Sequence, residues 1–134
     1  IEALHSGGSA ARALAGRLRD HLASGRLELR THWFFPTSLF YFQSPADLLA
    51  ELAAMEFVIV KGDANYRRLV GDVHWPPDTP FERAVSYFPA PLVALRTLKS
   101  ELIVGLRDGQ AGQLDAQEPQ WLVNGRRGVV QARV

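Results

Sequence analysis

The feature of this sequence that most limits its fold is the uninterrupted apolar run Phe57-Val58-Ile59-Val60, which Lys61-Gly62-Asp63 follows at once. A run of this length, rich in β-branched residues, is typical of a parallel strand covered by helices on both faces. Gly62 can turn the chain, and Asp63 can cap a helix that continues through Leu69. Gly71 is placed to end that helix. The segment therefore predicts a strand, a tight turn and a helix in direct succession.

Helical and extended patterns alternate through most of the remaining chain. Helices are indicated where apolar residues recur every three or four positions behind a capping residue or a proline. Strands are indicated where apolar residues alternate with polar ones or form short runs. We expect helices at 10–24, 45–55 and 80–88, extended segments at 27–30, 92–98 and 102–106, and a packed aromatic loop at 33–42.

The C-terminal part carries a hairpin signal. Asn124-Gly125 stands between Trp121-Leu122-Val123 and a run that reaches Val130, and both turn positions tolerate positive φ. The alternation of helices and strands predicts an α/β fold of three layers, in which helices flank a largely parallel sheet and the hairpin adds an antiparallel edge. The 134 residues and 47% hydrophobic content indicate one domain, 1–134, that buries its own core.

The charge balance excludes several classes of partner. The 15 basic and 14 acidic residues are well mixed and leave a net charge of +1, so the sequence predicts neither a nucleic-acid partner nor a membrane partner. There is no cysteine and no apolar stretch of membrane-spanning length, which is typical of a cytoplasmic protein. The chain begins at Ile1 without an initiator Met or a signal peptide, so we expect it to be part of a longer protein.

The residues after the apolar strand suit an anion. They lie at the carboxyl end of a parallel strand, where ligands usually bind, and at a helix N-terminus, whose amides favour a phosphate or carboxylate. Lys61 and Arg67 add positive charge, and Asn65 and Tyr66 could bond substrate hydroxyls. The alternative is that Asp63 only caps the helix, that Tyr66 packs and that the cations are solvated.

A second group of cations ends the extended segment at 92–98. Arg96-Thr97-Leu98-Lys99 places a lysine where it could contact phosphate or stabilise developing charge. A basic end to a strand is also ordinary. The sequence contains neither GxxxxGK[ST] nor GxGxxG, which argues against a nucleotide P-loop and a dinucleotide loop. The four histidines are scattered without ligand spacing, and we assign them no metal role.

Several segments of the sequence together resemble a known family. They are 60–69, Gly71-Asp72, Trp75, Arg96-Thr97-Leu98-Lys99, Val104-Gly105-Leu106, Gly109-Gln110 and 121–131. With these residues the chain is similar to the C-terminal half of the metal-dependent damage-control phosphatases, in the branch named after acidic residue methyltransferase 1 and marked by an Arg-Thr-x-Lys motif. The agreement covers roughly 57–131 well and the first fifty residues loosely.

The resemblance implies hydrolysis of small phosphorylated metabolites, such as sugar phosphates, with a divalent transition metal (Mn, Co or Ni). It implies catalytic roles for Asp63 and Lys99. The metal ligands of the family lie upstream of the matched region, and we expect none in this chain and the missing N-terminal half as its partner. The substrate contacts implied are Lys61, Asp63, Asn65, Tyr66, Arg67, Arg96 and Lys99.

Two other functions fit the same residues. The chain could be a non-catalytic lobe that binds anions, since its metal half is absent from residues 1–56. The family name also records a carboxyl O-methyltransferase activity, but the sequence contains no glycine-rich loop for S-adenosylmethionine. Turnover by this polypeptide separates the first alternative from the phosphatase, and S-adenosylmethionine binding tests the second.

Overall fold

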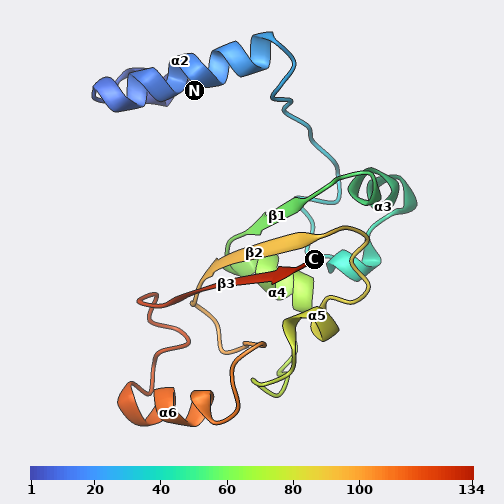
Figure 1. Ribbon diagram of the computed structural model, residues 1–134, viewed down its shortest axis with the longest axis vertical. Helices are drawn as coiled ribbons and strands as arrows, with labels where there is room; N and C mark the ends of the chain where they lie inside the picture. Colours follow the sequence, from blue (N-terminus) through green and yellow to red (C-terminus); the bar gives the residue numbers. More distant parts are fainter. The chain divides into compact units, whose positions relative to one another are not determined.

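The computed structural model describes residues 1–134, apart from the side chain of His5, and divides them into two compact units, Ile1–Phe35 and Pro36–Val134. The first unit contains α1 (Glu2–His5) and α2 (Ser9–Ala23), as Figure 1 shows. The helix predicted at 10–24 is confirmed. The strand predicted at 27–30 is wrong: those residues form no strand, and Leu29 is 81% exposed. A two-residue alternation yields a strand only where a neighbouring strand can pair with it.

The second unit is built on a three-stranded mixed sheet. Its strands are β1 (Val58–Lys61), β2 (Leu92–Thr97) and β3 (Gly128–Arg133), in the order β1-β2-β3 (Figure 1). β1 and β2 are parallel, whereas β2 and β3 are antiparallel. The α/β class is therefore confirmed, but a largely parallel sheet is not, because the two pairings are of opposite kinds.

The hairpin predicted around Asn124-Gly125 is wrong. β3 pairs with β2, with Leu92 opposite Arg133, and residues 121–123 form turns instead of a strand. Gly125 has a φ of 74°, but Asn124 is not among the described residues with positive φ, so the two-residue turn does not form. Trp121 explains the difference, because it is buried in a cluster with Leu98 and Ile103, which draws the chain away from a strand path.

Most of the predicted helices of this unit are confirmed, although shorter than expected. α3 (Ala46–Ala53), α4 (Asp63–Val70) and α5 (Phe81–Ala84) occupy the predicted places. A short 3-10 helix (Tyr41–Gln43) ends the aromatic loop, and α6 (Gln110–Gln117) was not predicted. Its sequence has no apolar stripe, and none of its residues is buried. The segment at 102–106 stays outside the sheet, with Leu102, Ile103 and Val104 buried.

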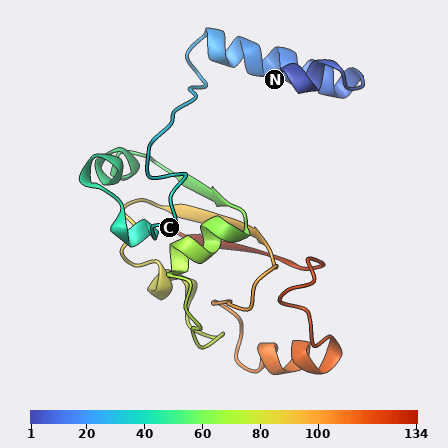
Figure 2. The same cartoon turned by 180° about the vertical axis from the view of Figure 1, so that it is seen from behind.

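The two faces of the sheet differ. One face packs against α4, which lies across it in Figure 2, and its central strand contributes the buried residues Leu92, Ala94 and Arg96. On the other face Ile59 is 62% and Val130 is 75% exposed. The expectation that helices cover β1 on both faces is therefore wrong for this chain. None of the described helices has the length and apolar character that a membrane crossing requires.

The turn between β1 and α4 depends on a glycine. Gly62 has φ 102° and ψ 157°, a backbone region that is essentially restricted to glycine. Its amide donates to the Leu95 carbonyl oxygen at 2.8 Å, which ties the turn to β2. The turn thus brings the first residue of α4 to the carboxyl ends of both parallel strands.

We expect Gly62→Ala to lower the free energy of unfolding by about 1–3 kcal/mol, because alanine must adopt this strained conformation. The matched control is Gly112→Ala inside α6, where a new methyl group meets no atom within 4 Å. That variant should be more stable by roughly 0.5–1 kcal/mol, since alanine favours helices. Urea denaturation of both variants provides the measurement. Equal effects of the two substitutions would contradict the role of Gly62.

Burial should also raise the pH at which the three tyrosines ionise. It raises the pKa of Tyr66 to about 12 and raises the pKa values of Tyr41 and Tyr87. These phenols therefore favour folding below the unfolded pKa of about 10, and that contribution is lost as the pH rises toward the folded values. We expect tyrosinate absorbance to appear together with loss of circular dichroism. Tyrosinate formation near pH 10 in a chain that stays folded would contradict this.

Candidate anion site

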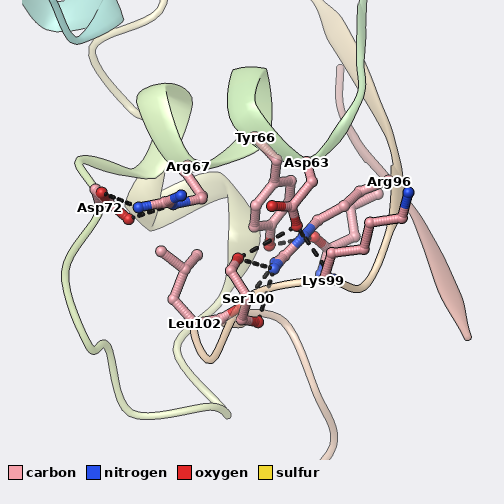
Figure 3. Close-up of polar contacts among 9 residues, drawn as sticks. Asp63, Tyr66, Arg67, Asp72, Arg96, Lys99, Ser100 and Leu102 are labelled. Atoms are coloured by element: carbon pink, nitrogen blue, oxygen red, sulfur yellow. Dashed lines mark hydrogen bonds and ion pairs between the residues drawn. The ribbon is translucent and has the colours of Figure 1, made fainter. Parts of the chain in front are cut away.

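The carboxylate of Asp63 does not cap its helix. Gly62 is the N-cap residue of α4, and no side chain caps this helix. The Asp63 side chain instead points toward the loop after β2, where it meets Arg96 and Ser100 (Figure 3). The interpretation of Asp63 as a simple cap is therefore wrong. The amides of the first helical turn are left for another acceptor.

Arg96 holds this loop and Asp63 together. It is only 3% exposed, and its Nε donates to Asp63 Oδ1 at 2.7 Å. Its Nη1 donates to the Leu102 carbonyl oxygen at 2.6 Å, and its Nη2 donates to the carbonyl oxygen and Oγ of Ser100 at 3.0 and 2.6 Å. The guanidinium carbon lies 4.5 Å from the ring centroid of Tyr66. Four donors of this buried fork are thus satisfied within the protein.

The Asp63 carboxylate is fixed through one of its two oxygens. Oδ1 accepts from Arg96 Nε, from Ser100 Oγ at 3.2 Å and from the Lys99 amide at 3.3 Å. Within the described part of the chain, Oδ2 has no hydrogen-bond partner. The carboxylate is therefore held in one orientation and keeps one oxygen for a ligand.

Asp63 borders a cavity of the second unit. The cavity has a volume of about 580 Å³ and lies where β1 and β2 end. For the described residues, no hydrogen bond or ion pair involves the Lys99 ammonium, and Figure 3 shows it extended away from Arg67. The cavity thus brings the cations Lys61 and Lys99 close to the Asp63 carboxylate, at the ends of the two parallel strands. Its walls are Lys61, Gly62, Asp63, Leu95, Arg96, Thr97, Lys99, Gly128, Val129 and Val130.

The other predicted site residues have protein partners. Asn65 Nδ2 donates to the Lys61 carbonyl oxygen at 3.0 Å. Tyr66 is 1% exposed, and its hydroxyl donates to Gln131 Oε1 at 2.7 Å, so it packs under the site as the alternative interpretation proposed. Arg96 is likewise engaged below the cavity. Substrate contacts by these residues remain predictions.

Arg67 forms a separate ion pair. Its Nε and Nη2 donate to the two carboxylate oxygens of Asp72, both at 2.7 Å. These bonds lower the pKa of Asp72 and raise that of Arg67. A second cavity of about 310 Å³ is lined by this pair and by His74, Lys99 and Glu101, among others. Lys99 borders both cavities, whereas Asp63 lines only the first of them and Arg67 only the second.

Sequence reasoning missed the roles of Ser100 and of the Leu102 backbone. Ser100 interrupts two apolar segments as part of the polar stretch Lys99-Ser100-Glu101. That interruption was the available signal, because a short polar break beside buried strands often marks a loop that satisfies a buried charge.

The described residues do not form a metal site of their own. No group of three or more His, Cys, Asp or Glu residues is placed among them to hold a metal ion. Asp63 is the one carboxylate among the residues that line the 580 Å³ cavity, and its Oδ1 already accepts three hydrogen bonds. The divalent metal implied by the family resemblance therefore does not fit these residues alone.

Comparison with known proteins establishes the family. The model of the damage-control phosphatase ARMT1-like domain matches residues 1–114. The chain belongs to this family. It is 52% identical to mouse damage-control phosphatase ARMT1 over 90 residues, which is 66% of this chain and 20% of that protein. The bovine and human proteins of the same name are 45% and 40% identical over 116 residues, which is 84% of this chain and 26% of each.

This chain of the ARMT1-like family thus spans about a fifth to a quarter of the length of the curated relatives it matches. The matched region includes both parts of the site, Asp63 to Arg67 and Arg96 to Ser100. The sequence-based recognition of the damage-control phosphatase ARMT1-like family is confirmed, and the assignment of the Arg-Thr-x-Lys motif stays a prediction.

We expect the bond between Arg96 and Asp63 to contribute strongly to the free energy of unfolding. Replacing one partner of a buried pair leaves an unpaired charge and costs about 3–5 kcal/mol. In a double-mutant cycle of Arg96→Lys and Asp63→Asn, the coupling energy should exceed about 1 kcal/mol. The pair Arg126 and Glu118, 3.2 Å apart, is the control because its arginine is 77% exposed, and its coupling should stay below about 1 kcal/mol. Similar coupling in both cycles would show that Arg96 has no special role.

Proposed function

We propose that this chain supplies the substrate- and phosphate-binding half of a cytoplasmic, metal-dependent phosphatase that hydrolyses phosphorylated metabolites such as sugar phosphates. One observation carries the proposal. A fixed Asp63 carboxylate and the extended Lys99 side chain border one cavity at the ends of two parallel strands. The printed names of the relatives, all damage-control phosphatases, support the same reaction class.

The residues of this chain would divide the work by charge. Lys99 and the amides at the start of α4 would neutralise the phosphoryl oxygens, on which negative charge is spread during transfer. The free Oδ2 of Asp63 would accept a hydrogen bond from the attacking water or a substrate hydroxyl. Arg96 would have a supporting role, because its four hydrogen bonds hold Asp63 and the loop that contains Lys99 in fixed positions relative to each other.

The ligands of the metal would come from outside the site described above. A divalent transition ion (Mn, Co or Ni) supplies Lewis-acid chemistry in such enzymes when it is bound. Because the ligands do not gather in this chain, we assign them to polypeptide that the relatives possess and this chain lacks. That polypeptide is the expected partner.

The second candidate is a non-catalytic lobe that binds anions. The absence of a cluster of metal-binding side chains among the described residues favours it, while the cavity and its cations remain. This lobe would bind phosphate without turning over any phosphate ester.

The test combines phosphate binding and phosphate release. Calorimetry with inorganic phosphate should give affinities roughly tenfold weaker for Lys99→Gln, because one charge-assisted bond is lost. Arg107→Gln removes the same charge from an exposed residue outside both cavities, and its affinity should match that of the unaltered chain.

Phosphate release from sugar phosphates is then measured with added Mn, Co or Ni, in a protein that contains this chain and its metal-binding part. Asp63→Asn should lower turnover roughly a hundredfold, as the loss of a positioned acid-base group does. Normal turnover in both Asp63→Asn and Lys99→Gln would overturn the phosphatase site. Release by this chain alone would exclude the binding lobe.

A further inference from the structure

Just after the end of α4, the chain turns so that Asp72 contacts Arg67. Gly71 and Asp72 both have positive φ, 83° and 52°, and the Asp72 amide donates to the Arg67 carbonyl oxygen at 2.8 Å. Asp72 is the one described non-glycine residue with positive φ. The same residue therefore contacts Arg67 twice, once through its backbone and once through its carboxylate.

The pair leaves part of the Arg67 guanidinium available. A guanidinium has five N–H donors, and Asp72 takes one on Nε and one on Nη2. Among the described contacts Nη1 has none. Arg67 and Lys99 both line the second cavity, although the Lys99 ammonium extends away from Arg67 (Figure 3).

Stability alone does not account for this arrangement. The Arg67 and Asp72 side chains are 43% and 34% exposed, and ion pairs this exposed to water contribute little to the free energy of unfolding. A bidentate pair does fix direction, because both N–H bonds must stay in the plane of the carboxylate. The surrounding charges are His74 and Glu101, which also line the cavity, and Asp63, which raises the pKa of Arg67.

We propose that Asp72 is a positioning residue: it holds the Arg67 fork so that Nη1 faces the cavity that Arg67 shares with Lys99, and thereby makes Arg67 a second cation for a bound phosphate. This inference rests on the proposed function, since it assumes that the site binds phosphate. Asp72 itself does not touch the anion.

The inference is tested by whether Asp72→Asn raises or lowers the affinity for phosphate. Asp72→Asn keeps the left-handed backbone, which asparagine tolerates, but removes the charge and one acceptor. If Asp72 acted only through its charge, its removal would strengthen phosphate binding. If it positions Arg67, phosphate affinity falls roughly three- to tenfold, because the freed side chain must be ordered on binding. The urea midpoint should stay close to that of the unaltered chain.

Inorganic phosphate binding is measured by calorimetry in this chain, in Asp72→Asn, in Arg67→Gln and in the double variant. In the Arg67→Gln background Asp72→Asn should cause no further loss. Glu118→Gln is the matched control, because it removes a carboxylate that pairs with Arg126 and Arg127 outside both cavities and should leave the affinity unchanged. The NMR signal of Arg67 Nε–H should be sharp in the unaltered chain and lost in Asp72→Asn.

The outcomes separate the two claims. Unchanged or tighter binding by Asp72→Asn, when Lys99→Gln still weakens binding, overturns the role of Asp72 and leaves the proposed function standing. A loss of affinity that persists without Arg67 also overturns it. No phosphate binding by the unaltered chain overturns both.

Discussion

A buried guanidinium is costly unless its donors are satisfied, and this cost governs how the second unit is built. Arg96 is nearly inaccessible to solvent, so the loop after β2 must present the Ser100 and Leu102 oxygens to it, and α4 must present Asp63. A lysine could not serve the same partners, because a compact ammonium has no planar fork. The position of the loop, and with it that of Lys99, follows from this one side chain.

The surrounding elements are arranged to make those bonds possible. Parallel pairing of β1 and β2 brings their carboxyl ends together, so that Lys61 lies opposite Leu95. The Gly62 turn then starts α4 beside Arg96, and the buried ring of Tyr66 forms a floor for the guanidinium. Arg96 from a strand, Asp63 from a helix and Ser100 from a loop therefore form one hydrogen-bonded unit.

Local signals in the sequence were enough for some elements and too weak for others. The strand at β1, the turn at Gly62 and the end of α4 at Gly71 could be predicted, because each depends on residues within a few positions. The path of residues 121–128 could not, since burial of Trp121 against Leu98 is a distant contact. Likewise Asp63 suggested a cap, because its true partner, Arg96, is 33 positions away. Lys61, Asp63 and Lys99, three of the predicted site residues, line one cavity, and their contacts with a substrate stay predictions.

The network around Arg96 also determines which part of the site is already ordered before any ligand arrives. Asp63, Ser100 and the Lys99 backbone are immobilised during folding, whereas the Lys99 side chain extends from a fixed anchor without a bond to other described residues. On the side of the protein, binding an anion at Lys99 therefore costs mainly the rotamer entropy of that lysine, about 2 kcal/mol or less. A long, unrestrained cation on a rigid base can also follow a phosphoryl group as its oxygens move, without any rearrangement of the backbone.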